Sequence, residues 1–452
     1  MADSLRASTQ GLAVVDRARR RKGWTKTWTS AWWEAAYTSQ ATVRRFWRGL
    51  AIQRENFIAI CQAVGIEDWQ AIAADPEVPE PGDETPVLTE AAQPWAGGEE
   101  NSGAALQGAP ATLLELPEGP VRLGSALYLE RPPIERRCYQ TLAQPGALIR
   151  IKAPRQMGKT SLLNRILAEA GQQGYRTVRL NLLQAEASAL SSLDRFLRWF
   201  CLCLGRKLHL EGEVDDFWQP GWGSVVSCTA YVQERILEGD DRPFCLALDE
   251  ADRVFQFPDV TQGFFPMLRS WHEEAKTMAV WERLRLVVAH STEDYGMLDI
   301  NQSPFNVGLP VELTEFSLAQ VEDLAGRHDL DLTQASLQAL MSRVGGHPYL
   351  IRLALYHLAC GDLTLEQLLL EAASDAGIYE HHLRRHWMTL KEQPELAAAF
   401  HQAIAADEPI QLKPIAAYQL YRMGLIRRQR DRALPRCQLY QQYFQEQLAV
   451  GD

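Results

Sequence analysis

The sequence predicts a multidomain protein whose centre is an α/β domain with a parallel, doubly wound sheet. Three observations predict it. Apolar, strand-like runs alternate with helical segments between residues 121 and 315. One of these runs leads into a Gly-Lys-Thr loop and then an amphipathic helix. The stretches on both sides of this region show helical periodicity instead. A chain of 452 residues is long enough for about two to four domains.

The composition is that of an ordinary globular protein, with 46% hydrophobic and 23% charged residues. No run approaches the ~18 consecutive apolar residues of a membrane span, and the start, "MADSLRASTQ", lacks the apolar stretch of a secretory signal. We therefore expect a cytoplasmic protein without membrane contact. The eight cysteines form no C-x-x-C pair, which predicts reduced thiols rather than a zinc site.

The N-terminal part of the chain consists of a basic stretch followed by an acidic one. Residues 1–73 are basic, mainly through "RARRRK" and "VRRFWR", whereas residues 74–120 contain no Lys or Arg and are rich in Pro, Gly and Glu. Such a stretch buries too little apolar surface to stabilise a fold. We predict a basic head at residues 1–73 and an acidic linker at 74–120.

The head is predicted to be all helical. "SAWWEAAYTSQATVRRFWRG" indicates helix, turn and helix, with Ser39 as N-cap and Val43 and Phe46 facing inward, and "QRENFIAICQAVGI" and "DWQAIAA" supply two closing helices. The segment resembles helix-turn-helix domains of the lambda-repressor-like type. That resemblance implies a set of DNA-contacting side chains on and before the helix that begins near residue 40: Ser39, Gln40, Thr42, Arg44, Arg45 and Arg48. Six tryptophans in the head suit a protein partner equally well.

The stretch "IRIKAPRQMGKTSLLNRIL" predicts a phosphate-binding loop between a strand and a helix. Lys159 would face the β- and γ-phosphates, the Thr160 hydroxyl would ligate Mg²⁺, and Gly158 would let the backbone approach the phosphates. Ala153 stands where such loops usually begin with glycine, and a small side chain is tolerable there. The expected nucleotide-binding residues of the loop are Ala153, Pro154, Arg155, Gln156, Met157, Gly158, Lys159, Thr160 and Ser161.

The run "RPFCLALDEADRV" predicts a buried strand that ends in two carboxylates. Asp249 would hold Mg²⁺ through water, and Glu250 would polarise the water that attacks the γ-phosphate, so Glu250 and Lys159 are the expected catalytic residues. A further strand, "RLRLVVAHS", ends in His290 and Ser291, where a γ-phosphate sensor would lie; an ordinary strand-end turn is the alternative.

Beyond the core at 121–315 we predict a helical lid at 316–394 and a winged-helix tail at 395–452, in which "LIRRQ" and "PRCQLY" are the strands of the wing. We favour packing against the lid over DNA contact for this tail, with Arg427, Arg428 and Arg430 as solvated charges.

The motifs "YLERPPIE", "IRIKAPRQMGKTSLLNRIL", "LALDEADRVF", "VVAHSTEDYG" and "VGGHPYLIRLALYHL" resemble those of AAA-like signal-transduction ATPases, a group that includes STAND-type and origin-recognition-like proteins. More narrowly, the chain resembles the bacterial AAA-like domain family over about residues 121–390. The resemblance implies ATP and Mg²⁺ as cofactors, alternation between ATP- and ADP-bound states, and an adenine site near Arg131, with His347 and Pro348 over the nucleotide.

Ring-forming motors of this superfamily present an arginine near the segment that here is "EDYGMLDINQSPF", which has no Arg or Lys. This departure favours a slow switch over a ring motor, with Arg343 or Arg352 as cationic groups of the same chain. The head resembles modules attached to bacterial conflict-system proteins, which implies a sensor or regulator in a bacterial defence system.

Three hypotheses remain open. The favoured one is a signal-transduction switch that binds ATP and hydrolyses it slowly. The second is a DNA-binding transcriptional regulator controlled by nucleotide, and the third is a scaffold that holds nucleotide without turnover. Expected partners are ATP and ADP, a protein or DNA at the head, and further copies of the chain.

Overall fold

The computed structural model describes residues 4–22, 24, 30–47, 49–74, 114–210, 214–219, 221–293 and 307–449. The chain divides into two compact units, residues Met1–Gln107 and Gly108–Asp452, and each is described by itself. The predicted linker falls largely on residues outside this description, and the boundaries of head, linker, core, lid and tail stay predictions. Within the described residues, no helix is both long and apolar enough to cross a membrane.

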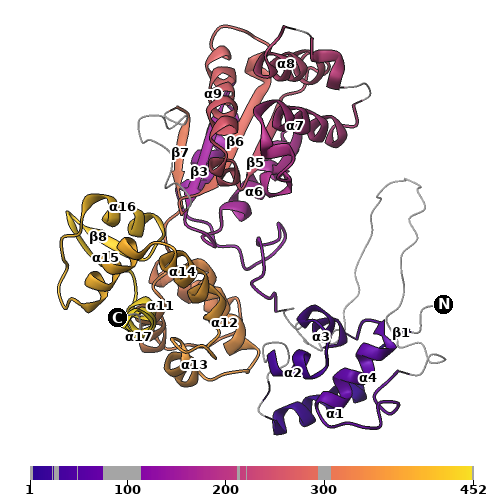
Figure 1. The fold of residues 1–452 in the computed structure, drawn as a ribbon, viewed down its shortest axis with the longest axis vertical. Helices are drawn as coiled ribbons and strands as arrows, with labels where there is room; N and C mark the ends of the chain where they lie inside the picture. Colours follow the sequence, from indigo (N-terminus) through magenta and orange to yellow (C-terminus); the bar gives the residue numbers. More distant parts are fainter. Residues whose placement is uncertain are drawn as a thin grey trace, which may run out of the picture. The chain divides into compact units, whose positions relative to one another are not determined.

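The first unit is a small helical cluster with one short pair of strands (Figure 1). Its elements are β1 (Ser4–Leu5), α1 (Thr9–Arg21), α2 (Ser30–Ala35), α3 (Gln40–Trp47), β2 (Ile52–Gln53) and α4 (Arg54–Ala63). The prediction of an all-helical head is wrong in two respects. β1 pairs antiparallel with β2, because the start of the chain folds back onto the connection between α3 and α4. The stretch 68–74 is a turn rather than a closing helix, and Ala73 pairs with Ala7.

The predicted inward-facing residues of the head do form its core. Val43 and Phe46 of α3 are fully buried, together with Val15 of α1, Trp32 of α2 and Phe57 of α4. The rings of Phe46 and Phe57 lie 5.2 Å apart. The aromatic residues of the head therefore contribute mainly to packing where the structure describes them.

The second unit contains the predicted parallel sheet. Its five strands are β3 (Leu148–Ala153), β4 (Arg176–Asn181), β5 (Phe244–Asp249), β6 (Leu284–Ser291) and β7 (Leu309–Glu312). They lie in the order β4-β5-β6-β3-β7, and all neighbours are parallel. Each strand corresponds to one of the apolar runs in the sequence, so the parallel α/β core is confirmed. Because β6 lies between β3 and β5, the ends of the phosphate-loop strand and of the carboxylate strand flank the end of β6.

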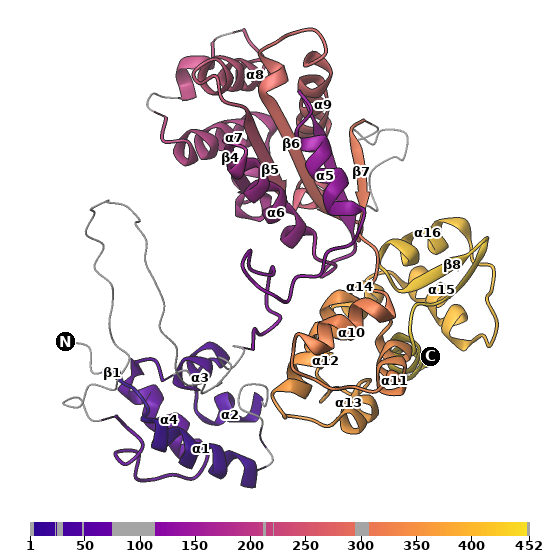
Figure 2. The same ribbon diagram turned by 180° about the vertical axis from the view of Figure 1, so that it is seen from behind.

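Helices cover both faces of this sheet (Figure 2). One face packs against α5 (Ile134–Leu142) and α6 (Lys159–Gln172), and the other against α7 (Leu193–Lys207), α8 (Ser224–Ala230) and α9 (Pro258–Glu274). Alternate residues of β5 show the division: Cys245 and Ala247 face the first group, and Leu246 and Leu248 the second. Short helical turns connect these elements: η1 (Leu182–Gln184), η2 (Ala189–Ser191), η3 (Val214–Phe217), η4 (Tyr231–Leu237), η5 (Ala251–Gln256) and η6 (Trp281–Arg283).

The C-terminal helices share one hydrophobic core. They are α10 (Leu318–Gly326), α11 (Gln334–Val344), α12 (Pro348–Ala359), α13 (Leu365–Glu371), α14 (Glu380–Lys391), α15 (Pro394–Ala405), α16 (Pro414–Arg422) and α17 (Gln438–Ala449), with a hairpin of β8 (Ile426–Gln429) and β9 (Arg432–Pro435) before α17. A bridge between Ile410 and Ala433 adds to this hairpin. The order of hairpin and last helix is as predicted, but the second strand of the hairpin is β9 (Arg432–Pro435) and not "PRCQLY", whose last three residues begin α17. The assignment of the tail as a winged helix stays a prediction.

Candidate functional site

The ends of β3 and β5 bring the predicted phosphate loop and the predicted carboxylates together. Parallel strands end at the same edge of a sheet, where open α/β sheets bind their ligands. The Thr160 hydroxyl, at the start of α6, donates to the two carboxylate oxygens of Asp249 at 3.2 and 3.1 Å, although the two residues are 89 positions apart. The two halves of the candidate site therefore meet as the sequence predicts.

Positive backbone dihedrals shape the loop between β3 and α6. Gln156 has φ +63° and Gly158 has φ +95°. Lys159 is buried at the helix start, and its Nζ donates to the carbonyl oxygens of Ala153 and Pro154 at 3.1 and 2.9 Å. Burial lowers the pKa of Lys159, while the nearby Glu250 opposes that shift. The ammonium group thus links the start of α6 to the first residues of the loop. An anion bound in the loop would lie close to it.

Other loop residues pack against the protein. Ala153 and Met157 are buried in the core between the sheet and helices α5 and α6, which explains why a methyl group is tolerated at position 153. The Arg155 N–H donates to the carboxylate of Glu293 at 2.7 Å, so Glu293 occupies one of the loop donors expected to face phosphate. The Ser161 hydroxyl accepts from the N–H of Val121 at 2.9 Å.

The carboxylate side of the site is crowded with charge. Asp249 is almost fully buried, and its Oδ2 accepts from the Arg179 guanidinium at 2.6 Å. Glu250 follows in the left-handed region, with φ +54°, and is partly exposed. Burial raises the pKa of Glu250, and the neighbouring carboxylate of Asp252 raises it further, against the lowering effect of Lys159. A carboxylate with a raised pKa is a better proton acceptor than an ordinary surface glutamate.

The predicted sensor residues end β6 beside these groups. The His290 ring is buried edge-on to Phe255, and burial lowers its pKa to about 4, so the imidazole is neutral at pH 7. The Ser291 N–H donates to the buried carboxylate of Asp252 at 2.6 Å, and the Ser291 hydroxyl accepts from the N–H of Glu293. These contacts fix the strand end, and a phosphate-sensing role stays a prediction.

Arg131 reaches the loop from the segment before α5. Its NH2 lies 3.1 Å from the position that a Cβ on Gly158 would take, and its guanidinium lies 5.0 Å from the centre of the Phe316 ring. Its backbone N–H donates to Glu135, whose carboxylate also accepts from the Tyr128 hydroxyl. The segment expected near the nucleotide is therefore anchored beside the loop.

The C-terminal helices also reach the loop, through residues that sequence reasoning missed. His382 of α14 bonds the Gln156 side-chain oxygen through Nδ1 and the Tyr440 hydroxyl of α17 through Nε2, both at 2.7 Å. Arg385 donates to the same Gln156 oxygen at 3.2 Å and lies 3.9 Å from Glu293. The only available signal was the histidine-rich stretch "EHHLRRHW", which gives no hint of its partners.

The residues predicted to cover the nucleotide lie beside this contact. His347 is buried next to Pro348, the first residue of α12, and its ring stands edge-on to that of His382 at 5.1 Å. Burial lowers the pKa of His347 to about 3, and its Nδ1 has no hydrogen-bond partner.

The two arginines considered as cationic groups of the same chain lie elsewhere. Arg343 donates to Gln442 of α17, and Arg352 is buried in α12. The arginines with contacts to the loop or to Asp249 are Arg131, Arg179 and Arg385. The segment "EDYGMLDINQSPF" spans residues 293–305, and all of it except Glu293 lies outside the described residues.

The donor set fits Mg²⁺. Thr160 offers a hydroxyl and Asp249 a carboxylate, and Mg²⁺ prefers oxygen ligands and keeps several waters and substrate phosphates rather than an all-protein cage. In the part of the chain that the structure describes, there is no group of three or more His, Cys, Asp or Glu side chains that could hold a metal.

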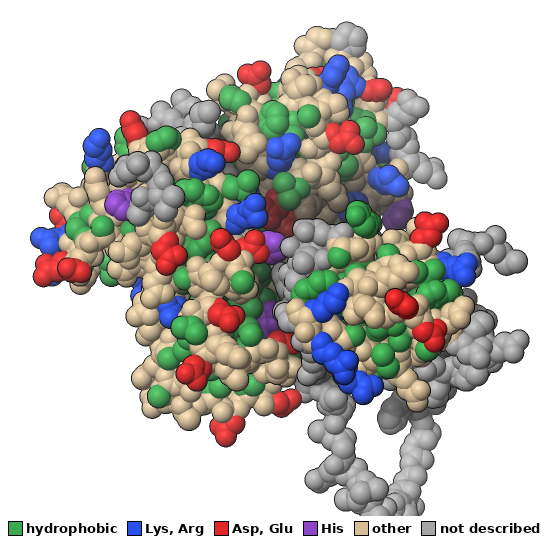
Figure 3. Space-filling model, turned by 60° about the horizontal axis from the view of Figure 1, so that its bottom comes forward, with side chains coloured by type: hydrophobic (Ala, Val, Ile, Leu, Met, Phe, Trp, Pro, Cys, Tyr) green, Lys and Arg blue, Asp and Glu red, His purple; other side chains and the backbone are tan. Residues whose placement is uncertain are grey.

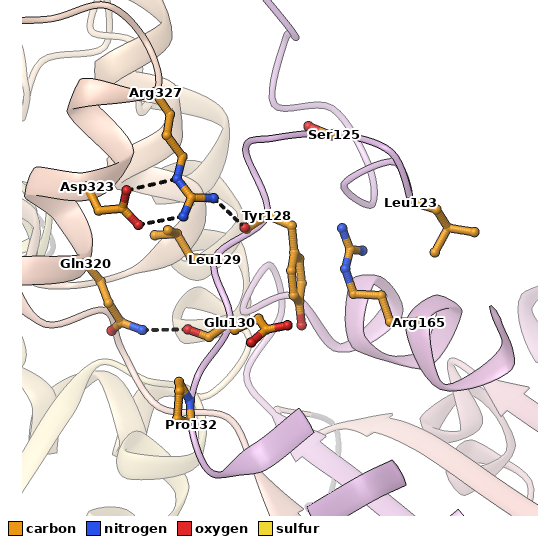
Figure 4. A pocket seen from close by; sticks show the side chains of 10 residues that line it. All are labelled: Leu123, Ser125, Tyr128, Leu129, Glu130, Pro132, Arg165, Gln320, Asp323 and Arg327. Atoms are coloured by element: carbon orange, nitrogen blue, oxygen red, sulfur yellow. Dashed lines mark hydrogen bonds and ion pairs between the residues drawn. The ribbon is translucent and has the colours of Figure 1, made fainter. Parts of the chain in front are cut away.

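A separate cavity of about 520 Å³ lies beside the segment before α5 (Figure 4). In it the Tyr128 ring stands next to the Arg165 guanidinium, 3.3 Å from the ring centre, and Asp323 holds Arg327. It is lined by Leu123, Ser125, Tyr128, Leu129, Glu130, Pro132, Arg165, Gln320, Asp323 and Arg327. None of these belongs to the phosphate loop, so the cavity is distinct from it.

Of the candidate DNA contacts in the head, Ser39, Thr42 and Arg45 are described; the side chains of Gln40 and Arg44, and all of Arg48, lie outside the described residues. Ser39 caps α3 as predicted, since its hydroxyl accepts from the Thr42 N–H. Arg45 is exposed and donates to the Ala51 carbonyl. On the face shown in Figure 3, Lys and Arg side chains lie among hydrophobic and acidic ones.

Comparison with known proteins places most of the second unit in one family. A family model described as "AAA-like domain" matches residues 116–446. An uncharacterized WD repeat-containing protein of Synechocystis is 26% identical over 294 residues, which are 62% of this chain but 24% of that protein.

Solved structures with similar folds include a Walker-type ATPase of Pyrococcus abyssi, at 12% identity and a TM-score of 0.49 over 70% of this chain and 95% of that one. The ORC2 protein of Aeropyrum pernix follows at 16% identity and a TM-score of 0.41, over 70% and 93%. With a parallel sheet, a loop and paired carboxylates in the matched region, the chain belongs to the AAA-like domain family.

Proposed function

We propose that this chain binds ATP with Mg²⁺ at the loop between β3 and α6 and hydrolyses it slowly. The observation that carries the proposal is the contact of Thr160 with Asp249, beside Lys159 and Glu250. A hydroxyl, a carboxylate, a lysine and a second carboxylate at one sheet edge are the groups that phosphoryl transfer to water requires.

Each group has a separate task in this reaction. The backbone N–H groups at the start of α6 and the Lys159 ammonium would bind the β- and γ-phosphates. Thr160 and Asp249 would hold Mg²⁺, which neutralises phosphate charge when bound. Glu250 would orient the attacking water and accept its proton, a role favoured by its raised pKa.

The contacts of the loop with the C-terminal helices also support a switch. Gln156 of the loop bonds α14, and α14 bonds α17, so a change in the loop on phosphate binding would reach the C-terminal helices directly. Slow turnover suits such a switch. The resemblance of the head to modules of bacterial conflict-system proteins supports a sensor or regulator in a defence system.

The basic head gives a second candidate, a DNA-binding regulator controlled by the nucleotide. The capped helix α3 with the exposed Arg45 favours it, because this is the placement of a reading helix with a phosphate contact.

Phosphate release by the full chain tests the proposal. Glu250→Gln should retain ATP while hydrolysis falls by about 10²-fold or more, because the attacking water loses its base. Glu234→Gln, at an exposed position of η4, is the matched control and should behave as wild type. Wild-type protein that binds ATP without any turnover would instead support a scaffold.

A further inference from the structure

Arg179 is the cationic partner of the candidate metal ligand Asp249 and has no role in the reaction described above. It lies in β4, opposite Ala247 of β5, two positions before the pair Asn181 and Asp249. One of its terminal nitrogens donates to the Asn164 side chain of α6 at 3.1 Å, and the other donates to Asp249 Oδ2 at 2.6 Å. The arginine therefore spans from the helix that follows the loop to the carboxylate.

The burial of the two partners is unequal. The Asp249 side chain is 1% exposed, whereas that of Arg179 is 34% exposed. A carboxylate buried to this extent is costly without a partner charge, and the Arg179 guanidinium supplies that charge. The arginine, in contrast, has solvent beside it and can move away at modest cost.

The guanidinium and a divalent cation would compete for the same oxygen. Asp249 Oδ2 lies 2.6 Å from Arg179 and 3.1 Å from the Thr160 hydroxyl, which is the other candidate ligand. A cation held between Thr160 and Asp249 would stand close to the positive guanidinium, and like charges at such distances repel.

We propose that Arg179 is a built-in counter-cation for the candidate metal site: it pairs with Asp249 until a divalent cation displaces it. This inference rests on the proposed function, because it takes Asp249 as a metal ligand. Arg179 is thus a positioning residue that sets the affinity of the site for a divalent cation. The stronger the ion pair between Arg179 and Asp249, the higher the metal concentration needed to occupy the site.

The test is Mn²⁺ binding to the nucleotide-free full chain, measured by electron paramagnetic resonance. Arg179→Met keeps an unbranched apolar stem without the charged guanidinium and should bind Mn²⁺ at least about 10-fold more tightly than wild type, because the competing cation is gone. Arg179→Lys should stay within about 3-fold of wild type, because the charge is retained.

Arg176→Met is the matched control. Arg176 lies in the same strand and pairs with Asp240 at 3.4 Å, away from Asp249, so its loss should leave Mn²⁺ affinity unchanged. The double variant Arg179→Met with Asp249→Asn should lose the added affinity, which would assign the gain to the Asp249 carboxylate.

Two results would overturn the inference, and they have different meanings. Equal or weaker Mn²⁺ binding in Arg179→Met, with binding still lost in Asp249→Asn, would show that Arg179 does not compete and would leave the metal role of Asp249 intact. Mn²⁺ affinity that does not respond to Asp249→Asn, in the absence or presence of ATP, would remove Asp249 as a ligand and with it that part of the proposed function.

Discussion

The two sides of the candidate site are built in different ways. The floor, made of loop residues 153–161 with Asp249 and Glu250, comes from the ends of β3 and β5, the two parallel strands on either side of β6. The wall, made of His382, Arg385 and Tyr440, comes from α14 and α17. His382 and Arg385 lie more than 220 residues further along the chain than Gln156, the loop residue that they contact, and Tyr440 bonds His382. The strand ends position the reactive groups of the floor, whereas the packing of the C-terminal helices positions the residues of the wall.

This difference suggests a division of labour. Most contacts within the floor join groups expected to touch the nucleotide, so changes there should affect ATP binding most. The wall meets the floor through the single side chain of Gln156 and belongs to the shared core of α10–α17, so changes there should mainly affect stability.

A large effect on ATP affinity is expected in the floor for Gly158→Ala. The residue has φ +95°, and a Cβ there would lie 3.1 Å from the Arg131 guanidinium and would intrude where phosphate must approach. We expect ATP affinity to fall by about 10³-fold, or roughly 4 kcal/mol. Calorimetry with Mg²⁺ and ATP measures it.

Gly174→Ala is the matched control for that change. Gly174 also has a positive φ, of +79°, but a Cβ there would meet nothing within 4 Å. It should lower stability slightly and leave ATP affinity within about 2-fold of wild type. Equal losses of ATP affinity in both variants would mean that backbone strain, and not the approach of phosphate, causes the effect.

A smaller effect is expected in the wall, for His382→Ala. The change removes two hydrogen bonds and leaves the buried Tyr440 hydroxyl without its partner, so the free energy of unfolding should fall by about 3 kcal/mol. Urea denaturation of the full chain measures it. His381→Ala, at the exposed neighbouring position, should stay within about 0.5 kcal/mol of wild type. Similar losses for both histidines would contradict the buried contact.

Acid should destabilise the second unit through its buried histidines. His290 has a folded pKa of about 4 against 6.5 for an unfolded histidine, so below pH 6.5 the unfolded chain binds more protons than the folded one. The free energy of unfolding therefore falls as pH falls, by about 2 kcal/mol for this histidine at pH 5. His290→Gln should reduce the loss of unfolding free energy between pH 7 and pH 5 by that amount, as measured by urea denaturation at both pH values. An unchanged loss would contradict a buried neutral ring.

The smallest effect is expected in the head. If the head binds DNA, Arg45→Ala should weaken binding about 3-fold on all sequences and should lower the salt dependence by about one counterion, as for loss of one phosphate contact. Arg17→Ala, at an exposed position of α1, tests whether general positive charge is sufficient. Gel shifts of the full chain at two salt concentrations measure both, and no shift at low salt would favour a protein partner.

The contrast between floor and wall also shows what the sequence could predict. Apolar runs that end in Gly-Lys-Thr and Asp-Glu predict both strands and their shared edge, because parallel strands align their ends. Arg179 lies in β4, and its pairing with Asp249 depends on strand order and register, which no local pattern reveals. His382 and Arg385 depend on the packing of a helix 226 residues beyond Gln156, which sequence periodicity cannot give.

The head shows the same limit at a smaller scale. Ser39 and the core positions Val43 and Phe46 follow from local helix patterns, which the structure matches. The pairing of β1 with β2 joins the start of the chain to residues 52 and 53, and neither two-residue strand carries a recognisable alternation.

ATP binding at the loop is the central claim, and calorimetry on the full chain with Mg²⁺ tests it most directly. Wild-type protein should bind ATP with a Kd of about 1 μM or tighter, and Lys159→Ala should abolish binding, because it deletes the main cation facing the phosphates. Lys152→Ala, which removes a lysine of the adjoining strand paired with Glu312, should bind as wild type. Unchanged ATP affinity in Lys159→Ala would contradict the account.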